Sequence, residues 1–207
     1  PEDGPRGAHP SQHVRPPCLK ELDQLQQASG NRVRLITLSP EYENAPEFIR
    51  GAVAQGIRIA IGHTNATTEQ LAAAVAAGAT LSTHLGNGAH PILKRHPNYI
   101  WDQLADERLS ASLIVDGHHL PPSVVKAMAK VKGPEKIILV GDQTGLAGLP
   151  TGRYETALGA VEMLPDGKLV VAGQTQILAG ATAPLPVNIA LLQRFTQWDL
   201  ATAVDCA

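Results

Sequence analysis

The chain has 207 residues, of which 43% are hydrophobic and 17% charged, which fits one large domain or part of a bigger protein. Its formal net charge is −2, with 17 basic against 19 acidic residues, so the sequence offers no basic surface for nucleic acid or an anionic membrane. No segment is apolar enough to span a membrane, and Cys18 and Cys206 lack metal-type or redox spacing, so we expect a soluble cytoplasmic protein with ordinary thiols.

Strand-like and helix-like patterns alternate through the first two thirds of the chain. In chain order we predict helix 19–27, strand 33–38, helix 45–55, strand 57–62, helix 68–77, strand 79–84, helix 97–107, strand 111–117, helix 121–132 and strand 136–142. Asn44 is expected to cap the second helix, and Thr67 with Gln70 forms the capping-box pattern before the third.

The repeated strand–helix unit predicts a parallel α/β fold. Its strands are almost entirely apolar, as expected when helices cover both faces of a sheet. Residues 152–175 break the rhythm and turn at Pro165-Asp166-Gly167, which predicts a β-hairpin excursion, and a last helix is predicted over 184–194. Five strands fit either an open doubly wound sheet or an incomplete (β/α)8 TIM-type barrel.

Ionisable side chains follow the predicted strands. His63 follows strand 57–62, His84 ends strand 79–84, His118-His119 follow strand 111–117, and Asp142 ends strand 136–142. In a parallel barrel these strand ends face one mouth, where imidazoles can bind a metal ion and a carboxylate can carry a proton. A single histidine at a strand end is more often structural, and an aspartate there is often a helix cap. Four successive strand ends together favour a site.

Several motifs occur in the order found in the N-acetylglucosamine-6-phosphate deacetylases of the amidohydrolase superfamily, which the chain resembles from Gly7 to about Gly180. They are "GPRGAH", "GHTNAT", "THLGNGAHPILKRHPN", "IVDGHHL", "ILVGDQT" and "LAGA". The resemblance implies a metal-dependent (β/α)8 barrel with a small β-sandwich. It implies hydrolysis of the acetamide of an N-acetyl amino-sugar phosphate, giving glucosamine-6-phosphate and acetate from N-acetylglucosamine-6-phosphate.

The resemblance also implies roles for individual residues. His63 and His84 match metal ligands, with zinc the expected divalent ion, and Asp142 matches the catalytic aspartate. The residues that match substrate contacts are Ala8, Asn87, Gly88, Arg95, His119, Leu178, Ala179 and Gly180. Among these, Arg95 and His119 match phosphate contacts, which in the family often come from the neighbouring subunit of a homodimer.

The sequence departs from the family pattern at its start. The family's third metal ligand, a glutamate in an "EGP" motif, would precede Pro1, and Glu2 lies too near "GAH" to replace it. We therefore expect residues 1–207 to be one partial metal-dependent amidohydrolase barrel that lacks the first strands and the sandwich. Two other functions stay open: an amidohydrolase of a different amide or cyclic amide, and a non-catalytic barrel fragment.

Overall fold

The computed structural model describes residues 3–157 and 159–207, so Pro1, Glu2 and Leu158 lie outside the described residues. The chain divides into two compact units, which are described one at a time. The first comprises Pro1–Arg6 and Val14–Ala111, and the second Gly7–His13 and Ser112–Ala207. Among the described residues, no helix has both the length and the apolar character needed to cross a membrane.

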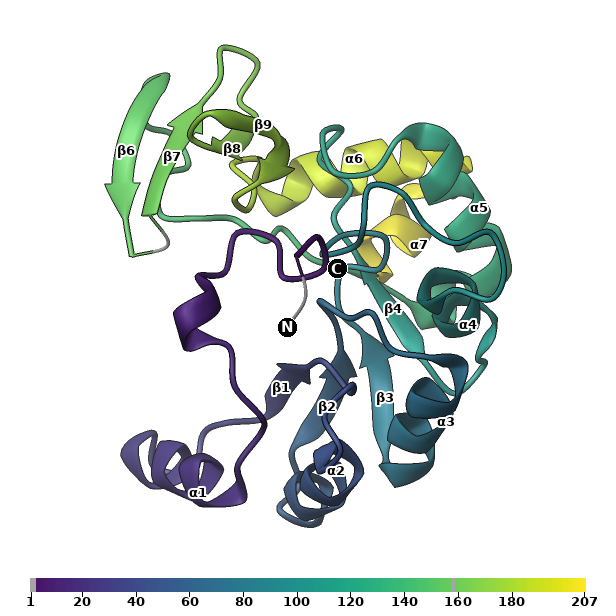
Figure 1. Cartoon of the computed structure of the whole chain (residues 1–207). Helices are drawn as coiled ribbons and strands as arrows, with labels where there is room; N and C mark the ends of the chain where they lie inside the picture. The colour runs from purple at the N-terminus through teal and green to yellow at the C-terminus, as the bar shows by residue number, and fades with distance from the viewer. Residues whose placement is uncertain (1–2, 158) are drawn as a thin grey trace. The chain divides into compact units, whose positions relative to one another are not determined.

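Five short strands form a sheet in the order β1-β2-β3-β4-β5, and the ladders that join β1 to β2, β2 to β3 and β3 to β4 are all parallel (Figure 1). Their bounds are Leu35–Leu38, Arg58–Ile61, Ala79–Ser82, Ser110–Leu113 and Ile137–Leu139. The order follows the chain, as repeated strand–helix units require when each connection leads to the next strand. The predicted α/β class is confirmed.

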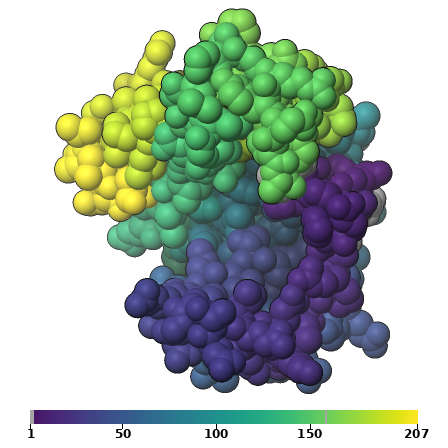
Figure 2. Space-filling model, turned by 90° about the vertical axis from the view of Figure 1, so that its left-hand side faces the viewer, coloured from purple at the N-terminus to yellow at the C-terminus, as the bar shows by residue number. Residues whose placement is uncertain are grey.

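Helices α2 to α5 alternate with strands β1 to β5 along the chain, as the sequence pattern predicts. Their bounds are α1 Leu19–Ala28, α2 Ala45–Ala54, α3 Thr68–Ala77, α4 Tyr99–Ala105, α5 Pro122–Lys132, α6 Leu185–Thr196 and α7 Leu200–Asp205. Short 3-10 helices cover Ser11–His13 and Pro134–Lys136. Helix α1 is an outer element of the first unit, with most of its residues exposed (Figure 2).

The helix-start predictions have mixed outcomes. The capping box of α3 is confirmed, because the Thr67 side chain accepts from the Gln70 amide and the Gln70 side chain accepts from the Thr67 amide. The expected Asn44 cap is wrong. Asn44 does occupy the position before α2, but its side-chain amide donates to the carbonyl of Pro17 at 2.8 Å instead.

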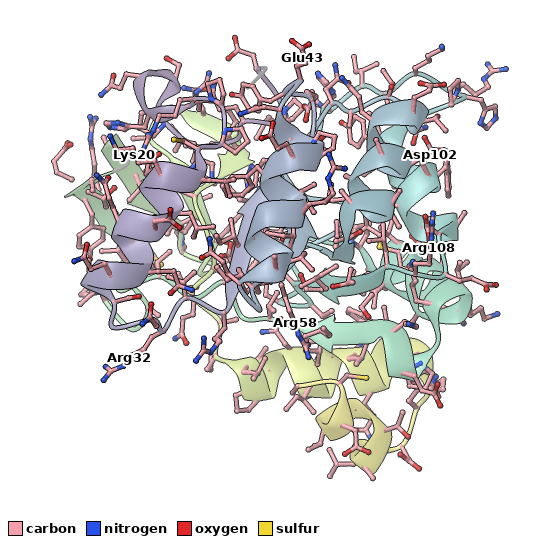
Figure 3. All side chains as sticks on the ribbon, turned by 90° about the horizontal axis from the view of Figure 1, so that it is seen from below. Lys20, Arg32, Glu43, Arg58, Asp102 and Arg108 are labelled. Carbon is pink, nitrogen blue, oxygen red and sulfur yellow. The ribbon has the colours of Figure 1, made fainter. Side chains whose placement is uncertain are left out.

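Aliphatic side chains fill the core of the first unit. Ile49 of α2 and the β2 residues Ile59 and Ile61 are fully buried, and Leu71 of α3 packs into the same cluster. The surface of this unit carries charges of both signs, among them Lys20, Glu43 and Arg58 (Figure 3). The apolar faces of α2 and α3 therefore pack against the sheet, and their polar faces are exposed to solvent.

Each strand is shorter than its apolar run, which corrects the placement of the ionisable residues. Strand β3 ends at Ser82 rather than at His84, β4 ends at Leu113, and β5 ends at Leu139 rather than at Asp142. His63, His84 and Asp142 thus lie in the loops just beyond the strands. The apolar residues that follow β4, such as Val115, are buried without being part of the ladder.

A second, antiparallel sheet belongs to the second unit. The predicted excursion at 152–175 is a four-stranded meander rather than one hairpin, with strands β6 Gly152–Thr156, β7 Gly159–Met163, β8 Leu169–Val171 and β9 Gln174–Leu178. The predicted turn at 165–167 is confirmed: Asp166 accepts from the Lys168 amide, and Gly167 has a φ of 85°. Val161, Met163, Leu169 and Ala179 form its core.

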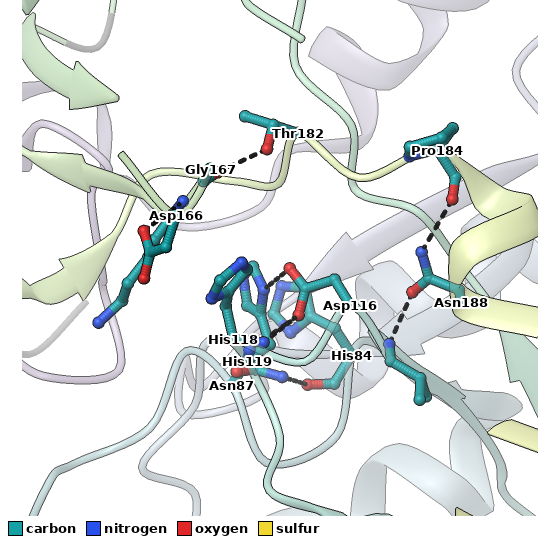
Figure 4. A network of polar contacts seen from close by, with 12 residues as sticks. His84, Asn87, Asp116, His118, His119, Asp166, Gly167, Thr182, Pro184 and Asn188 are labelled. Carbon is teal, nitrogen blue, oxygen red and sulfur yellow. Dashed lines mark hydrogen bonds and ion pairs between the residues drawn. The ribbon is translucent and has the colours of Figure 1, made fainter. Parts of the chain in front are cut away.

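Asn188 of α6 is fully buried and holds the segment that follows β4 (Figure 4). Its side-chain oxygen accepts from the amide of buried Val115 at 2.7 Å, and its side-chain nitrogen donates to the Pro184 carbonyl. The amide of Val115 lies outside the strand, so Asn188 supplies the acceptor that a neighbouring strand would otherwise provide.

We expect Asn188→Ala to lower the free energy of unfolding by about 1–3 kcal/mol, because the buried Val115 amide loses its acceptor. Urea unfolding followed by circular dichroism measures the change. Arg194→Ala, at an exposed position of the same helix, is the matched control and should stay within about 0.5 kcal/mol of the wild type. Equal small changes for both variants would contradict the structural role of Asn188.

Candidate active site

The imidazoles of His63 and His84 meet edge to face in the first unit. Their Nε2 atoms are 3.0 Å apart, and the ring planes cross at 78° with centroids 4.8 Å apart. The two histidines follow the adjacent parallel strands β2 and β3, and strand adjacency brings their side chains to the same edge of the sheet. The structure therefore places together the two residues that the sequence suggested as metal ligands.

The other ring nitrogen of His63 has a defined partner. Its Nδ1 lies 2.8 Å from the carbonyl oxygen of Pro5, which can only accept a hydrogen bond. The proton of a neutral His63 ring is therefore on Nδ1, and the lone pair is on Nε2. This is the usual arrangement of a metal-ligating histidine, whose second nitrogen donates to a carbonyl or carboxylate. On this donor chemistry, the pair fits a divalent ion such as zinc.

Three candidate residues share an uncommon backbone conformation. Among the described residues, the non-glycine positions with positive φ are Asn31, His63, His84, Asp142 and Gln197. Asn31 and Gln197 lie at helix ends, where left-handed residues are ordinary. His63, His84 and Asp142 instead follow strands, with φ of 51°, 31° and 47°. Such conformations cost about 1–3 kcal/mol when strained and cluster at functional sites.

Two predicted substrate contacts support the histidines directly. A Cβ on Gly88 would lie 2.7 Å from Nδ1 of His63, so only glycine lets this backbone pack against the ring. The φ of Gly88 is 55°, which also favours glycine. The side-chain amide of Asn87 donates to the carbonyl of His84 at 3.3 Å (Figure 4). Their roles toward a substrate stay predictions.

Glu41 is a polar residue that the sequence reasoning missed. One carboxylate oxygen accepts from the hydroxyl of Thr64 at 2.7 Å, and the other accepts from the amide of Asn65 at 2.6 Å. Both partners directly follow His63, so the carboxylate fixes the loop in which the imidazole is held. The only sequence signal is a glutamate just after a strand, and its partners lie 23 and 24 residues away.

Arg95 lies in the long loop between β3 and α4, and its side chain is exposed. The side chain of Asn98 donates to the carbonyls of Lys94 and Arg95 and accepts from the first amides of α4. This cap fixes the backbone near Arg95 and leaves the guanidinium on the surface. An exposed guanidinium keeps its donors available for an oxyanion.

In the second unit, Asp142 is exposed and lies beside the segment that follows β9. The carbonyl of Asp142 accepts from the amide of Ala181 at 2.9 Å, and an isolated parallel bridge joins Gln143 to Ala181. A Cβ on Gly180 would lie 2.6 Å from the Thr144 methyl and 4.0 Å from a carboxylate oxygen of Asp142. The chain thus returns from the antiparallel sheet to the side of the predicted catalytic carboxylate.

The remaining predicted contacts belong to the antiparallel sheet or pack against its core. Ala179 is buried among Met163 and Leu169, and Ala8 packs against the same cluster. Leu178 is the last residue of β9 and is half-buried. The methyl groups of Ala8 and Ala179 are thus engaged in packing, which leaves backbone atoms as the polar groups that these positions can offer.

Among the described residues of the second unit, Asp116 is the most deeply buried carboxylate. The sequence analysis assigned it no role. One oxygen accepts from the amides of His118 and His119, each at 2.9 Å, and the other lies 2.7 Å from Nδ1 of His119 (Figure 4). Burial raises the pKa of Asp116, but the hydrogen bonds from His119 and His118 outweigh it and lower the pKa to about 2.

The described residues place two candidate metal donors side by side. They contain no group of three or more His, Cys, Asp or Glu side chains arranged to hold a metal ion. His63 and His84 supply two donors of the first unit, whereas His119 and Asp142 belong to the second unit. The cysteines are free thiols, with Cys18 exposed and Cys206 buried.

Comparisons with known proteins agree on one kind of relative, although no protein-family model matches the chain. An N-acetylgalactosamine-6-phosphate deacetylase of Escherichia coli is 34% identical over 98% of this chain and 52% of the relative. The human N-acetylglucosamine-6-phosphate deacetylase is 32% identical over 98% of this chain and 50% of the relative. The chain thus spans about half the length of these relatives.

The fold comparison gives the same result. The solved structure of a Mycobacterium smegmatis N-acetyl-D-glucosamine-6-phosphate deacetylase has a TM-score of 0.88, with 31% identity over 98% of this chain and 52% of that chain. That protein is a mutant with alanine in place of an aspartate, in complex with N-acetyl-D-glucosamine-6-phosphate. The likeness confirms that the parallel sheet is part of a barrel rather than an open doubly wound sheet.

The low pKa of Asp116 predicts a pH dependence of stability. Its folded pKa of about 2 lies below the ordinary 3.8, so the stabilisation is complete above about pH 5 and is lost as pH falls toward 2, at about 1.4 kcal/mol per pKa unit. The unfolding free energies of wild type and Asp116→Asn should therefore converge between pH 5 and 2. Urea titrations at several pH values measure this, and a gap that stays constant would contradict it.

Proposed function

We propose that this chain, which is similar to N-acetylglucosamine-6-phosphate and N-acetylgalactosamine-6-phosphate deacetylases over nearly its whole length, forms the catalytic half of an enzyme acting on an N-acetyl amino-sugar phosphate. Water would cleave the acetamide bond, giving acetate and the free amino-sugar phosphate. The observation that carries this proposal is the facing pair of His63 and His84 at neighbouring strand ends, in a chain that matches deacetylases over 98% of its length.

His63 and His84 are the residues that would hold a divalent ion, and zinc is the ion that we propose. A bound zinc ion would supply Lewis-acid polarisation of the amide carbonyl and activation of water. The support is chemical: two imidazole nitrogens face each other, and Nδ1 of His63 is held by a carbonyl. A further donor is needed to complete a tetrahedral site, and the family resemblance suggests a glutamate before Pro1.

Asp142 is the proposed proton carrier. Amide hydrolysis requires a proton to leave water and later reach the nitrogen, because an amine anion is a poor leaving group. An exposed carboxylate just beyond a strand can perform both transfers. Its left-handed backbone, held through the Ala181 amide, supports a fixed position for this group.

Arg95 and His119 are the proposed phosphate contacts. A guanidinium binds phosphate through charge-assisted, often bidentate hydrogen bonds, and Arg95 is exposed in its loop. We also propose that the complete protein is a homodimer, as the family resemblance implies. We place it in the cytoplasm, where Cys18 and Cys206 would stay reduced. The substrates to assay are N-acetylglucosamine-6-phosphate and N-acetylgalactosamine-6-phosphate, because similar proteins are named as deacetylases of one or the other.

The function is tested by a deacetylase assay on the complete protein that carries this chain, with acetate release as the readout. We expect Asp142→Asn to lower kcat by about 10²–10⁴-fold, the usual contribution of general acid–base catalysis, with divalent metal retained. Asp166→Asn, at an exposed turn of the antiparallel sheet, is the control and should keep wild-type activity. Near-normal turnover by Asp142→Asn would reduce Asp142 to a structural residue.

The metal assignment predicts that His63→Ala protein retains less zinc than wild type after dialysis, as measured by elemental analysis. Gly88→Ala should show the same direction of change, because its methyl group would displace the His63 ring. Gly148→Ala is the control: it also has positive φ, but nothing lies near its Cβ position. Undiminished zinc in the His63→Ala protein would remove this site.

A further inference from the structure

We propose that Asp116 is a positioning residue for His119, fixing which nitrogen of the imidazole meets the sugar phosphate. The inference rests on the proposed function for the identity of the ligand. The pairing itself is independent of that function: Oδ2 of Asp116 lies 2.7 Å from Nδ1 of His119, and the side chains are 2% and 4% exposed (Figure 4). Enclosure on this scale restricts both groups to one arrangement.

The chemistry of the pair sets the orientation of the ring. An ionised carboxylate only accepts hydrogen bonds, so Nδ1 of His119 must carry a proton. The low pKa of Asp116 keeps its carboxyl ionised at neutral pH. With Nδ1 held in this way, Nε2 is the ring atom left to contact a ligand, as in histidines whose orientation is set by a carboxylate partner.

The same carboxylate fixes the backbone that carries the ring. Its Oδ1 accepts from the amides of His118 and His119, so one oxygen holds the loop while the other holds the imidazole. The loop is also anchored just before Asp116, where Asn188 accepts from the Val115 amide. A residue that served only as a loop cap would not need its second oxygen directed at Nδ1.

These two roles can be separated with Asp116→Asn. The amide oxygen of asparagine can keep both backbone hydrogen bonds, which turns its NH2 group toward Nδ1 of His119. Nδ1 must then become an acceptor, and the proton of the neutral ring moves to Nε2. The variant therefore preserves the loop cap and reverses the polarity of the nitrogen that faces the ligand.

The first measurement is nitrogen-15 NMR of the histidine side chains in the complete protein that carries this chain. We expect a His119 ring protonated on Nδ1 in the wild type and, in neutral form, on Nε2 in Asp116→Asn. His119→Gln identifies the resonance by its absence. A wild-type ring protonated only on Nε2 would overturn the proposal without reference to any activity or variant.

The second measurement compares a phosphorylated N-acetyl amino sugar with its unphosphorylated form. For Asp116→Asn we expect KM for the phosphorylated substrate to rise by about 10- to 100-fold, by analogy with the loss in affinity or activity when a metal-ligating histidine loses its hydrogen-bonding partner. The kinetics of the unphosphorylated sugar should stay within about twofold. In the His119→Gln background, Asp116→Asn should add little, because coupled residues are not additive.

The controls distinguish this proposal from its premise. Asp166→Asn removes a carboxylate that also accepts a backbone amide but faces no imidazole in the described contacts, and it should change neither readout. Unchanged KM values for Asp116→Asn, or equal losses on both substrates, would reduce Asp116 to a loop cap. Failure of the wild type to deacetylate either sugar would instead count against the proposed function, while the NMR result would stand on its own.

Discussion

The meeting of His63 and His84 depends on how two parallel strands end. Strands β2 and β3 are parallel neighbours whose last residues, Ile61 and Ser82, pair with each other, so the residues just beyond them leave the sheet at the same edge. Both histidines then adopt positive φ, which turns their side chains so that the Nε2 atoms are 3.0 Å apart. A β-region backbone at either position would send its ring in another direction. The chemistry available to the first unit follows from these two turns.

Such a conformation persists only where the surroundings determine it, and the first unit supplies several restraints. The Pro5 carbonyl holds Nδ1 of His63, and the backbone of Gly88 lies against the ring. Glu41 binds the two residues that follow His63. Each restraint comes from a different part of the chain, so the ring position is a product of the folded unit and not of its own loop.

In the second unit, burial and hydrogen bonding oppose each other at Asp116. Taking a carboxylate out of water favours its neutral form, yet three donors directed at its oxygens keep it ionised. Asn188 reinforces the same segment through the Val115 amide. Asp142 is in a different environment. Its side chain is exposed, and the segment after β9, at Gly180 and Ala181, contacts its backbone.

The sequence by itself determined the alternating α/β pattern, the capping box of α3, the turn at 165–167 and the residue types at the strand ends. These depend on local periodicity and turn chemistry. The tertiary structure decided where the strands stop, that Asn44 reaches Pro17 instead of capping α2, and that four strands follow Gly152. It also revealed Glu41 and Asp116, whose importance depends on partners and burial. Hydrogen-bond partners far along the chain, left-handed backbone turns and local desolvation leave no periodic signal, so only the folded chain shows them.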